Sequence, residues 1–373
     1  MATLRITHHG LRTEALMTRI RMGYIGAGFM AQRVHIPNFL SIPDCELIAL
    51  AEVRSELGRK VQQHFGIPRL YRDHEALLAD PDIEAIGVSA DFMVQGQIAR
   101  DALQAGKHVF MEKPMAVSIR QADEIVAAAK QAGKQLMVGY MKRYDAGNEL
   151  VKSTIDEWRA TGEMGRVTYA RNHGFCGDWI GGLDNTWIKT DEPYPRVPAV
   201  GPDWLPPAYL PRYLGYLQQY THNINLLRWF LGCGAQVSVR AVDLDDDGYT
   251  GVAILDLGGT RAVLETGGVS HYRWDEHTQI YFQHGWIQTW APPLLLRQVP
   301  AEVEIYRAGK TQTFTRPIPQ PNAWTWSYKR EAEAFIRCLQ TGEPIRSSAE
   351  DTRTDVVLYE EIYKAFLKAR GVL

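Results

Sequence analysis

The chain has 373 residues, of which 45% are hydrophobic, so it can bury a substantial core and is long enough for two domains. Its formal net charge of -2 provides no basic surface for nucleic acid and no attraction to an acidic membrane. The four cysteines lie far apart and form no CxxC pair, which argues against a zinc site or a disulfide framework. We therefore expect a cytoplasmic protein that acts on small molecules and binds neither nucleic acid nor membranes.

The first residues do not have the pattern of a targeting segment. Residues 1–19 contain charges throughout and lack an apolar stretch of signal-peptide length, and no later segment is apolar enough to span a bilayer. We interpret residues 1–19 as a disordered N-terminal extension, and we expect the folded part to begin with a short strand at 20–25.

A glycine-containing turn follows this strand. Gly26, Gly28 and Ala31 have the GxGxxA spacing, and residues 29–42 can continue as a helix. In a dinucleotide-binding fold the first glycine permits the tight turn, the second lets the backbone approach a pyrophosphate, and the alanine lets helix and strand pack closely. The N-terminus of the helix would then hold the anion. By itself, the spacing also fits an ordinary corner between a buried strand and a helix.

An acidic residue after the second strand favours the dinucleotide interpretation. Residues 45–54 contain an apolar strand that ends in Glu52, whose carboxylate is placed to accept hydrogen bonds from the adenosine ribose. The same carboxylate would repel a ribose 2'-phosphate, so we predict NAD as the cofactor, with NADP less favoured. Arg54 argues in the other direction, because a guanidinium here can pair with that phosphate. A solvated strand end is the alternative role for Glu52.

Strands and helices then alternate up to residue 140. Further strands are expected at 83–89, 108–112 and 135–140, separated by helices at 95–106 and 118–133, which predicts a doubly wound parallel sheet. From about residue 165, strands follow one another without intervening helices, which predicts a mostly antiparallel open sheet. The predicted fold is an α/β protein with an N-terminal Rossmann domain, 20–142, and a C-terminal α/β domain, 143–373.

Three motifs resemble those of the Gfo/Idh/MocA family of NAD(P)-dependent oxidoreductases, which act mainly on sugars, polyols and their derivatives. They are "GYIGAG" at 23–28, "AGKHVFMEKPMA" at 105–116 and "VGYMKRYDAG" at 138–147, and the last is similar to the inositol dehydrogenase branch. Residues 326–366 are similar to the helical return that closes the family's second domain, whereas the resemblance is weakest at 174–215. The resemblance implies NAD(P)-dependent redox chemistry without identifying the substrate.

The resemblance also implies two catalytic residues. Lys113 of the EKP motif would lie beside the nicotinamide and the reacting carbon, where it can manage the proton that a secondary alcohol loses. A lysine near a cationic nicotinamide has its ammonium form disfavoured, which suits this role. His222, close to the start of a helix expected from residue 223, would face the substrate and assist. A solvated lysine and a structural histidine are the alternatives.

The chain departs from the family pattern around these residues. Many members have an aspartate four residues before the histidine and another three after it, where this chain has Gln218 and Asn225. Without a carboxylate partner an imidazolium is less stabilised, so His222 is expected to be a weaker proton acceptor and Lys113 to carry the proton. At 90–95 the usual threonine-proline-asparagine turn and histidine are replaced, although Gln95 still offers a donor or acceptor.

The complete predicted site is larger. The cofactor contacts are Gly26, Gly28, Phe29, Met30, Glu52, Arg54, Ser89, Gln95, Glu112 and Lys113. The substrate contacts are Lys113, Tyr144, His173, Trp179, Gln218 and His222. Residues 243–248 copy the start of a calcium loop, but Ile254 stands at the twelfth position, where a glutamate is required, so no metal is predicted.

Residues 174–215 form an insertion that is rich in proline, tryptophan, tyrosine and glycine. A long ordered loop is usually functional, and two interpretations stay open. Its side chains either bind a sugar ring and its hydroxyls, or fill a subunit interface. The candidates are Asp178, Trp179, Asp184, Trp187, Lys189, Trp204 and Tyr209. The uncovered face of the second sheet, together with the family resemblance, predicts a homodimer or homotetramer.

These observations predict an NAD-dependent oxidoreductase that transfers a hydride between the nicotinamide and a ring hydroxyl or ketone of a sugar, cyclitol or glycoside. Two alternatives stay open. One is a redox-neutral NAD-dependent glycosidase, which would need an additional base such as Tyr220 or a residue of the insertion. The other is a catalytically silent NAD-binding regulator.

Overall fold

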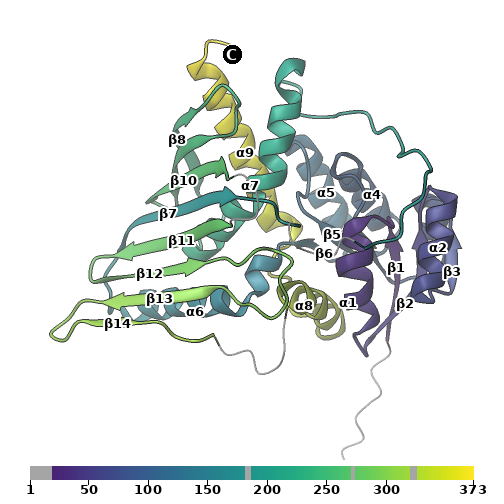
Figure 1. Ribbon diagram of the computed structural model, residues 1–373, viewed down its shortest axis with the longest axis horizontal. Coiled ribbons are helices and arrows are strands. Elements are labelled where there is room, and N and C mark those ends of the chain that lie inside the picture. The colour runs from purple at the N-terminus through teal and green to yellow at the C-terminus, as the bar shows by residue number, and fades with distance from the viewer. Residues whose placement is uncertain (1–18, 181–185, 270–273, 320–325) are drawn as a thin grey trace, which may run out of the picture.

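The computed structural model describes residues 19–180, 186–269, 274–319 and 326–373 (Figure 1). Almost all of the predicted N-terminal extension lies outside these ranges, as does Asp184 of the insertion. The described chain is built on two separate β-sheets, which confirms the predicted α/β architecture. No helix within these ranges is both long enough and apolar enough to cross a membrane.

The first sheet is entirely parallel and has the strand order β3-β2-β1-β4-β5-β6, which is that of a Rossmann fold. Strands β1 to β3 are added towards one edge of the sheet and β4 to β6 towards the other, so the strand order reverses between β1 and β4. A ligand crevice is expected at this reversal. Its strands are β1 (Ile20–Ile25), β2 (Cys45–Ala51), β3 (Arg69–Tyr71), β4 (Ala85–Val88), β5 (His108–Glu112) and β6 (Leu136–Gly139).

The helix after β1 is less regular than the sequence predicted. A π-helical turn, η1 (Ala31–His35), comes before α1 (Ile36–Leu40), and Pro37 lies in the first turn of α1, where its missing N–H is tolerated. The other helices of this unit are α2 (Ser55–Phe65), α3 (His74–Leu78), α4 (Phe92–Gln104) and α5 (Ile119–Ala132). A 3-10 turn, η2 (Met141–Tyr144), then leads out of the unit.

The second sheet has the order β14-β13-β12-β11-β7-β10-β9-β8, and β7 and β10 form its one parallel pair among the described strands. Helices α6 (Ala146–Thr161), α7 (Leu210–Leu231) and α9 (Ala349–Ala369) pack against one face (Figure 1). The strands are β7 (Val167–Cys176), β8 (Val237–Leu244), β9 (Gly251–Leu257), β10 (Thr260–Gly268), β11 (Asp275–Phe282), β12 (Gly285–Trp290), β13 (Glu302–Arg307) and β14 (Thr313–Thr315).

Helix α7 is much longer than predicted. It begins at Leu210, after the short turn η3 (Pro207–Tyr209), so His222 lies in its middle and not near its beginning. The missed first half contains buried Tyr213, Tyr216 and Tyr220, whose rings pack together with those of neighbouring elements. The helix ends at Gly232 in the left-handed conformation.

The C-terminal helices join the two units. Helix α8 (Ser327–Thr341) packs on α1, η1 and η2, and its Phe335 ring lies 5.8 Å from Phe110 and 6.4 Å from Phe39. Helix α9 contacts α5 of the first unit as well as β8 of the second. The helical return therefore packs on the first unit as well as closing the second, which fixes the two units against each other.

Candidate active site

A cavity of about 280 Å³ opens at the carboxyl ends of β1, β2 and β4. It lies at the switch point of the parallel sheet, where open α/β sheets bind their ligands. Five of the predicted cofactor residues come together in its lining: Gly26, Gly28, Glu52, Arg54 and Ser89.

The turn after β1 requires glycine at one position and leaves free space at another. Gly26 has a φ of 98°, and a Cβ atom on it would lie 2.7 Å from the carbonyl oxygen of Ser89. Gly28 also lines the cavity, and no atom lies within 4 Å of the place where its Cβ would be. The backbone therefore offers an unobstructed cradle that fits a pyrophosphate, as the GxGxxA spacing predicts.

Glu52 closes the far end of this cradle. It is 6% exposed, and its carboxylate accepts hydrogen bonds from the backbone N–H of Ala27 at 2.8 Å and of Arg54 at 3.1 Å. The Arg54 guanidinium donates to both carboxylate oxygens, at 2.8 and 3.0 Å. This bidentate pair engages the charge of Arg54 within the protein, so Arg54 is not free to pair with a phosphate here. The residues present thus fit a dinucleotide with an unphosphorylated ribose.

The EKP turn is held from two sides. The peptide bond between Lys113 and Pro114 is cis. Buried His35 donates from Nε2 to Glu112 Oε1 at 2.7 Å, and this bond helps to keep the pKa of Glu112 below its usual value although burial raises it. The Gln95 amide donates to the carbonyl oxygens of Glu112 and Pro114, both at 2.8 Å. Gln95 was predicted to contact the cofactor, but here it positions the turn that carries Lys113.

Lys113 reaches across to the second unit. Its Nζ donates to the carbonyl oxygen of Gln218 at 3.2 Å, while the contact of Gln218 with a substrate stays a prediction. Burial lowers the pKa of Lys113, and although the Glu112 carboxylate opposes this change, the nearby charge of Lys142 reinforces it. A lysine in this environment changes its protonation state more readily than a surface lysine.

His222 lies one helical turn after Gln218, on the same side of α7. It is 6% exposed, its ring meets Tyr140 edge-on at 6.2 Å, and among the described residues its Nδ1 atom has no hydrogen-bond partner. Burial, followed by the positive charges of Lys113 and Lys142, lowers the pKa of His222 well below its usual value. His222 is therefore a neutral imidazole at physiological pH, in agreement with the absence of a carboxylate partner.

A polar cluster that the sequence did not reveal lies beside these two residues. Buried Lys142 forms an ion pair with buried Glu276 of β11, and Glu276 also accepts hydrogen bonds from Asn223 at 3.2 Å and from the indole of Trp274 at 3.1 Å. The MKRYD motif drew attention to Lys142, but nothing in the local sequence linked it to Glu276. The two residues are 134 positions apart and meet only because β11 pairs with β7.

Comparisons with known proteins agree with this geometry. Residues 20–140 match the GFO_IDH_MocA family, described as an oxidoreductase family with an NAD-binding Rossmann fold. Over 364 residues the chain is 22% identical to myo-inositol 2-dehydrogenase of Thermotoga maritima, and the alignment covers 95% of this chain and 98% of that relative. Residues 20–140 form an NAD-binding Rossmann domain of the Gfo/Idh/MocA oxidoreductase family. The chain is therefore an oxidoreductase whose cofactor is a nicotinamide dinucleotide.

Solved structures share the fold of this chain across both units. An aldose-aldose oxidoreductase from Caulobacter crescentus is 20% identical with a TM-score of 0.69, over 94% of this chain and 98% of that one. The 3-ketoreductase KijD10 from Actinomadura kijaniata, solved in complex with NADP, is 21% identical with a TM-score of 0.67, over 93% of this chain and 98% of that one. At these identities the likeness establishes the fold alone.

His173 does not face α7, the helix that carries His222. Side chains along β7 alternate between faces, and it is buried Asn172 that points to α7, where its Oδ1 accepts from Asn223 at 2.8 Å. His173 lies on the opposite face and contacts Glu265 at 2.6 Å. The side chain expected to face the cleft is thus one residue away from the one that faces α7, because the period of a strand is two and the sequence did not define which face was inward.

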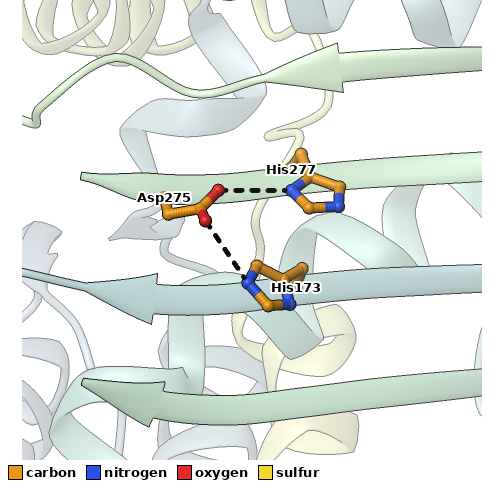
Figure 2. A group of neighbouring side chains, drawn as sticks. All are labelled: His173, Asp275 and His277. Atoms are coloured by element: carbon orange, nitrogen blue, oxygen red, sulfur yellow. Dashed lines mark ion pairs between the residues drawn. The ribbon is translucent and has the colours of Figure 1, made fainter. Parts of the chain in front are cut away.

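On that outer face, His173, Asp275 and His277 have the types and spacing of metal ligands (Figure 2). Figure 2 shows Asp275 between the two imidazoles, with carboxylate oxygens 3.7 Å from His173 Nε2 and 3.6 Å from His277 Nδ1. However, Arg171 donates to His277 Nε2 at 2.6 Å. A metal on Nδ1 would require a hydrogen on Nε2, which would then face a donor. A network of charge pairs accounts for the cluster better than a cation does.

Two other predicted residues are core residues. Tyr144 is 3% exposed, and its hydroxyl contacts the sulfur of Met137 at 3.7 Å, so it supports the packing between units and not the substrate. Tyr220, the base suggested for a redox-neutral glycosidase, is fully buried and donates to the carbonyl oxygen of Gly267 at 2.9 Å. Burial raises the pKa of Tyr220 above its usual value, so this phenol is neither accessible nor acidic enough for that role.

The aromatic residues of the insertion divide into two groups. Trp179 and Trp187 pack edge-on against Phe29 of the first unit, at 5.5 and 5.0 Å. Trp204 donates to Glu360 of α9 at 2.6 Å, and Tyr209 lies over α9 as well. The insertion is therefore bound to the body of the same chain, which neither predicted interpretation had foreseen.

Proposed function

We propose that this enzyme transfers a hydride between the nicotinamide of NAD and a ring hydroxyl or ketone of a sugar, cyclitol or glycoside. The observation that carries the proposal is the meeting of Lys113 and the Gln218 turn of α7, next to neutral His222. One basic group and one neutral hydrogen-bonding group suit an alcohol that must lose a proton as it loses a hydride.

The bound dinucleotide supplies the hydride acceptor or donor, and this chain's own residues manage the proton and the orientation. In the oxidising direction neutral Lys113 accepts the hydroxyl proton at Nζ and becomes an ammonium group. The lowered pKa of Lys113 makes its neutral form available, while His222 stays uncharged and orients the oxygen. The reverse reaction returns the proton from Lys113 to the ketone oxygen.

The cluster of Lys142, Glu276, Asn223 and Trp274 is the proposed recognition surface for the rest of the ring. Its donors and acceptors suit vicinal hydroxyl groups, and an indole face suits the apolar face of a sugar. The pair of Lys142 and Glu276 also fixes both charges, so the surface can contact a neutral ligand without leaving either ion unpaired.

The proposed preference for NAD over NADP comes from the pair of Glu52 and Arg54. Glu52 would accept hydrogen bonds from ribose hydroxyls and repel a 2'-phosphate, and Arg54 is already bound to it through two hydrogen bonds.

A turnover assay tests the proposal. Purified protein is incubated with NAD+ and a panel of free sugars, inositols and glycosides, and NADH absorbance is followed while each substrate is assayed for consumption. Steady NADH formation with a member of the panel, lost in Lys113→Ala, is the expected result. Substrate consumption without net NADH would overturn it in favour of the redox-neutral glycosidase, and turnover with NADP+ alone would overturn the cofactor preference.

A further inference from the structure

The insertion reaches the cofactor cavity. After β7 the chain crosses from the second sheet to the Rossmann unit, passes near α2 and returns to α7 (Figure 1). We call residues 186–197 the strap. Strap residues that line the cavity next to Glu52 and Arg54 are Tyr194, Pro195 and Val197.

The first attachment of the strap is to the helix that follows the glycine turn. The side chain of Gln32, 6% exposed, donates to the carbonyl oxygen of Ile188 at 3.1 Å and accepts from its N–H at 2.8 Å. The same amide donates to the carbonyl oxygen of Ala27 at 2.7 Å. Gln32 thus ties the strap directly to the backbone of the glycine turn.

The second attachment is to the N-terminus of α2. The residue at the N-cap position of α2, Arg54, makes no side-chain cap, and the carboxylate of Glu192 takes that role by accepting from the N–H groups of Glu56 and Leu57, both at 2.9 Å. These backbone bonds lower the pKa of Glu192, so it stays ionised at neutral pH. A carboxylate at a helix N-terminus is favourable, and here it comes from a residue 136 positions away in sequence from Glu56.

Tyr194 follows this attachment directly. Its ring lies over the Arg54 guanidinium at 5.0 Å, and the residue is 59% exposed although it lines the cavity. Arg54 is bound to Glu52, which marks the ribose end of the site. An accessible aromatic ring is therefore held at the adenosine end of a dinucleotide site.

We propose that the strap completes the adenosine half of the cofactor site. Tyr194 packs its ring against the adenosine of the bound dinucleotide, and Glu192 is a positioning residue that holds the strap on α2. The inference rests on the proposed function only in that the ligand is a nicotinamide dinucleotide. It assigns part of the site to the insertion, outside the Rossmann unit at 20–140 that matches the family.

Binding measurements test the proposal without any substrate. Calorimetry gives the dissociation constants of NADH, of ADP-ribose, which keeps the adenosine, and of nicotinamide mononucleotide, which lacks it; stopped-flow fluorescence gives the rate at which NADH dissociates. The variants are Tyr194→Ala, Tyr194→Phe and Glu192→Ala. The matched control is Asp203→Ala, an exposed acidic residue of the same insertion that pairs with Arg120 of α5 at 2.8 Å and does not line the cavity.

Tyr194→Ala should raise the dissociation constants of NADH and ADP-ribose about fivefold or more, which corresponds to the lower range for a base stacked on an aromatic ring. The dissociation constant of the mononucleotide should not change. Tyr194→Phe, which keeps the ring, should bind like the wild type. Glu192→Ala should speed NADH dissociation, and Asp203→Ala should not. If Tyr194→Ala binds ADP-ribose as tightly as the wild type does, the proposed role of the strap is wrong, although NADH binding still supports a dinucleotide site. If the wild type binds neither NADH nor NADPH, the proposed function itself is wrong.

Discussion

Lys113 of the first unit reaches the turn of α7 that precedes His222. Its Nζ lies 3.2 Å from the carbonyl oxygen of Gln218, which is four residues before His222. The lysine is carried by the turn after β5, and the histidine by a helix that packs under the second sheet. Because α8 and α9 fix the two units together, this distance is a property of the folded chain and does not depend on a ligand to close it.

Replacement of Lys113 by alanine should separate chemistry from binding. Removal of the proton acceptor should lower kcat by about 10²–10⁴-fold, the usual contribution of general base catalysis, while the NADH dissociation constant stays close to that of the wild type. Steady-state kinetics and NADH fluorescence titration check the two halves. Lys368→Ala, which removes an exposed lysine at the end of α9, is the control. Wild-type kcat in Lys113→Ala would exclude the proposed role.

The pH dependence of oxidation should report the protonation of Lys113. The neutral amine accepts the proton, so kcat/KM for alcohol oxidation should rise with pH and level off above the pKa of Lys113. That pKa is lowered by burial, so the plateau should be reached below the 10.5 of an ordinary lysine. The reducing direction needs the ammonium form and should lose rate over the same range. If the residual activity of Lys113→Ala has the same pH profile as the wild type, the rise in kcat/KM with pH belongs to another group.

Glu52→Ala should change the choice of cofactor. The variant loses the ribose acceptor and also frees the Arg54 guanidinium, which can then pair with a 2'-phosphate. NADH affinity should fall, NADPH affinity should rise, and the ratio of the two dissociation constants should shift by about tenfold or more. Titration of both cofactors measures the ratio. Glu46→Ala, an exposed glutamate on the same strand, should leave it unchanged, and an unchanged ratio in Glu52→Ala would mean that another residue reads the ribose.

The positions that follow most directly from the sequence are those set by nearby backbone. Gly26 and Glu52 come at the ends of short apolar strands and both line the cavity, and Lys113 follows a third strand of the same parallel sheet, so all three lie at its carboxyl edge. A period-two strand pattern does not say which face is inward. For this reason His173 was chosen where Asn172 faces α7.

The remaining errors come from contacts between distant segments. Lys142 and Glu276 pair only after β11 has found its register on β7, and Glu192 caps α2 only because the strap crosses the Rossmann unit. Neither contact leaves a signal in the sequence around either partner. The start of α7 was missed because Tyr213 and its aromatic neighbours are stabilised by tertiary packing, which overrides the local pattern.

The uncovered face of the second sheet should bind another copy of this chain. At its edge Trp286 lies 6.1 Å from Tyr306 and 6.0 Å from Phe314, and Phe314 is 53% exposed. Exposed aromatic clusters of this kind favour protein contacts, so light scattering should give a homodimer or homotetramer. Phe314→Asp should shift the equilibrium between oligomer and monomer towards the monomer. Leu40→Asp, at an exposed apolar residue of the first unit, should not, and a monomeric wild type would contradict the prediction.

Asn225→Asp should destabilise the fold although it restores the residue that many family members have. The Asn225 amide donates to Asp355 Oδ2 at 2.7 Å while its oxygen accepts from Arg143 Nε at 2.7 Å. An aspartate here would place an acceptor against Asp355, a carboxyl group whose pKa burial already raises. We expect a loss of about 1–3 kcal/mol in the free energy of unfolding, the cost of leaving a buried polar group without its partner.

The reciprocal change decides whether the loss comes from this one contact. In the double variant Asn225→Asp, Asp355→Asn, the donor and the acceptor exchange places, and Arg143 keeps an oxygen to bind at position 225. Arg228 loses the negative charge at position 355, but the amide oxygen there can still accept from it, and its ion pair with Asp351 at 3.2 Å remains. In urea denaturation, the free energy of unfolding that the double variant loses should therefore be smaller than the sum of the losses in the two single variants, since the two sites are coupled. Simple additivity would show that the amide of Asn225 does not act through Asp355.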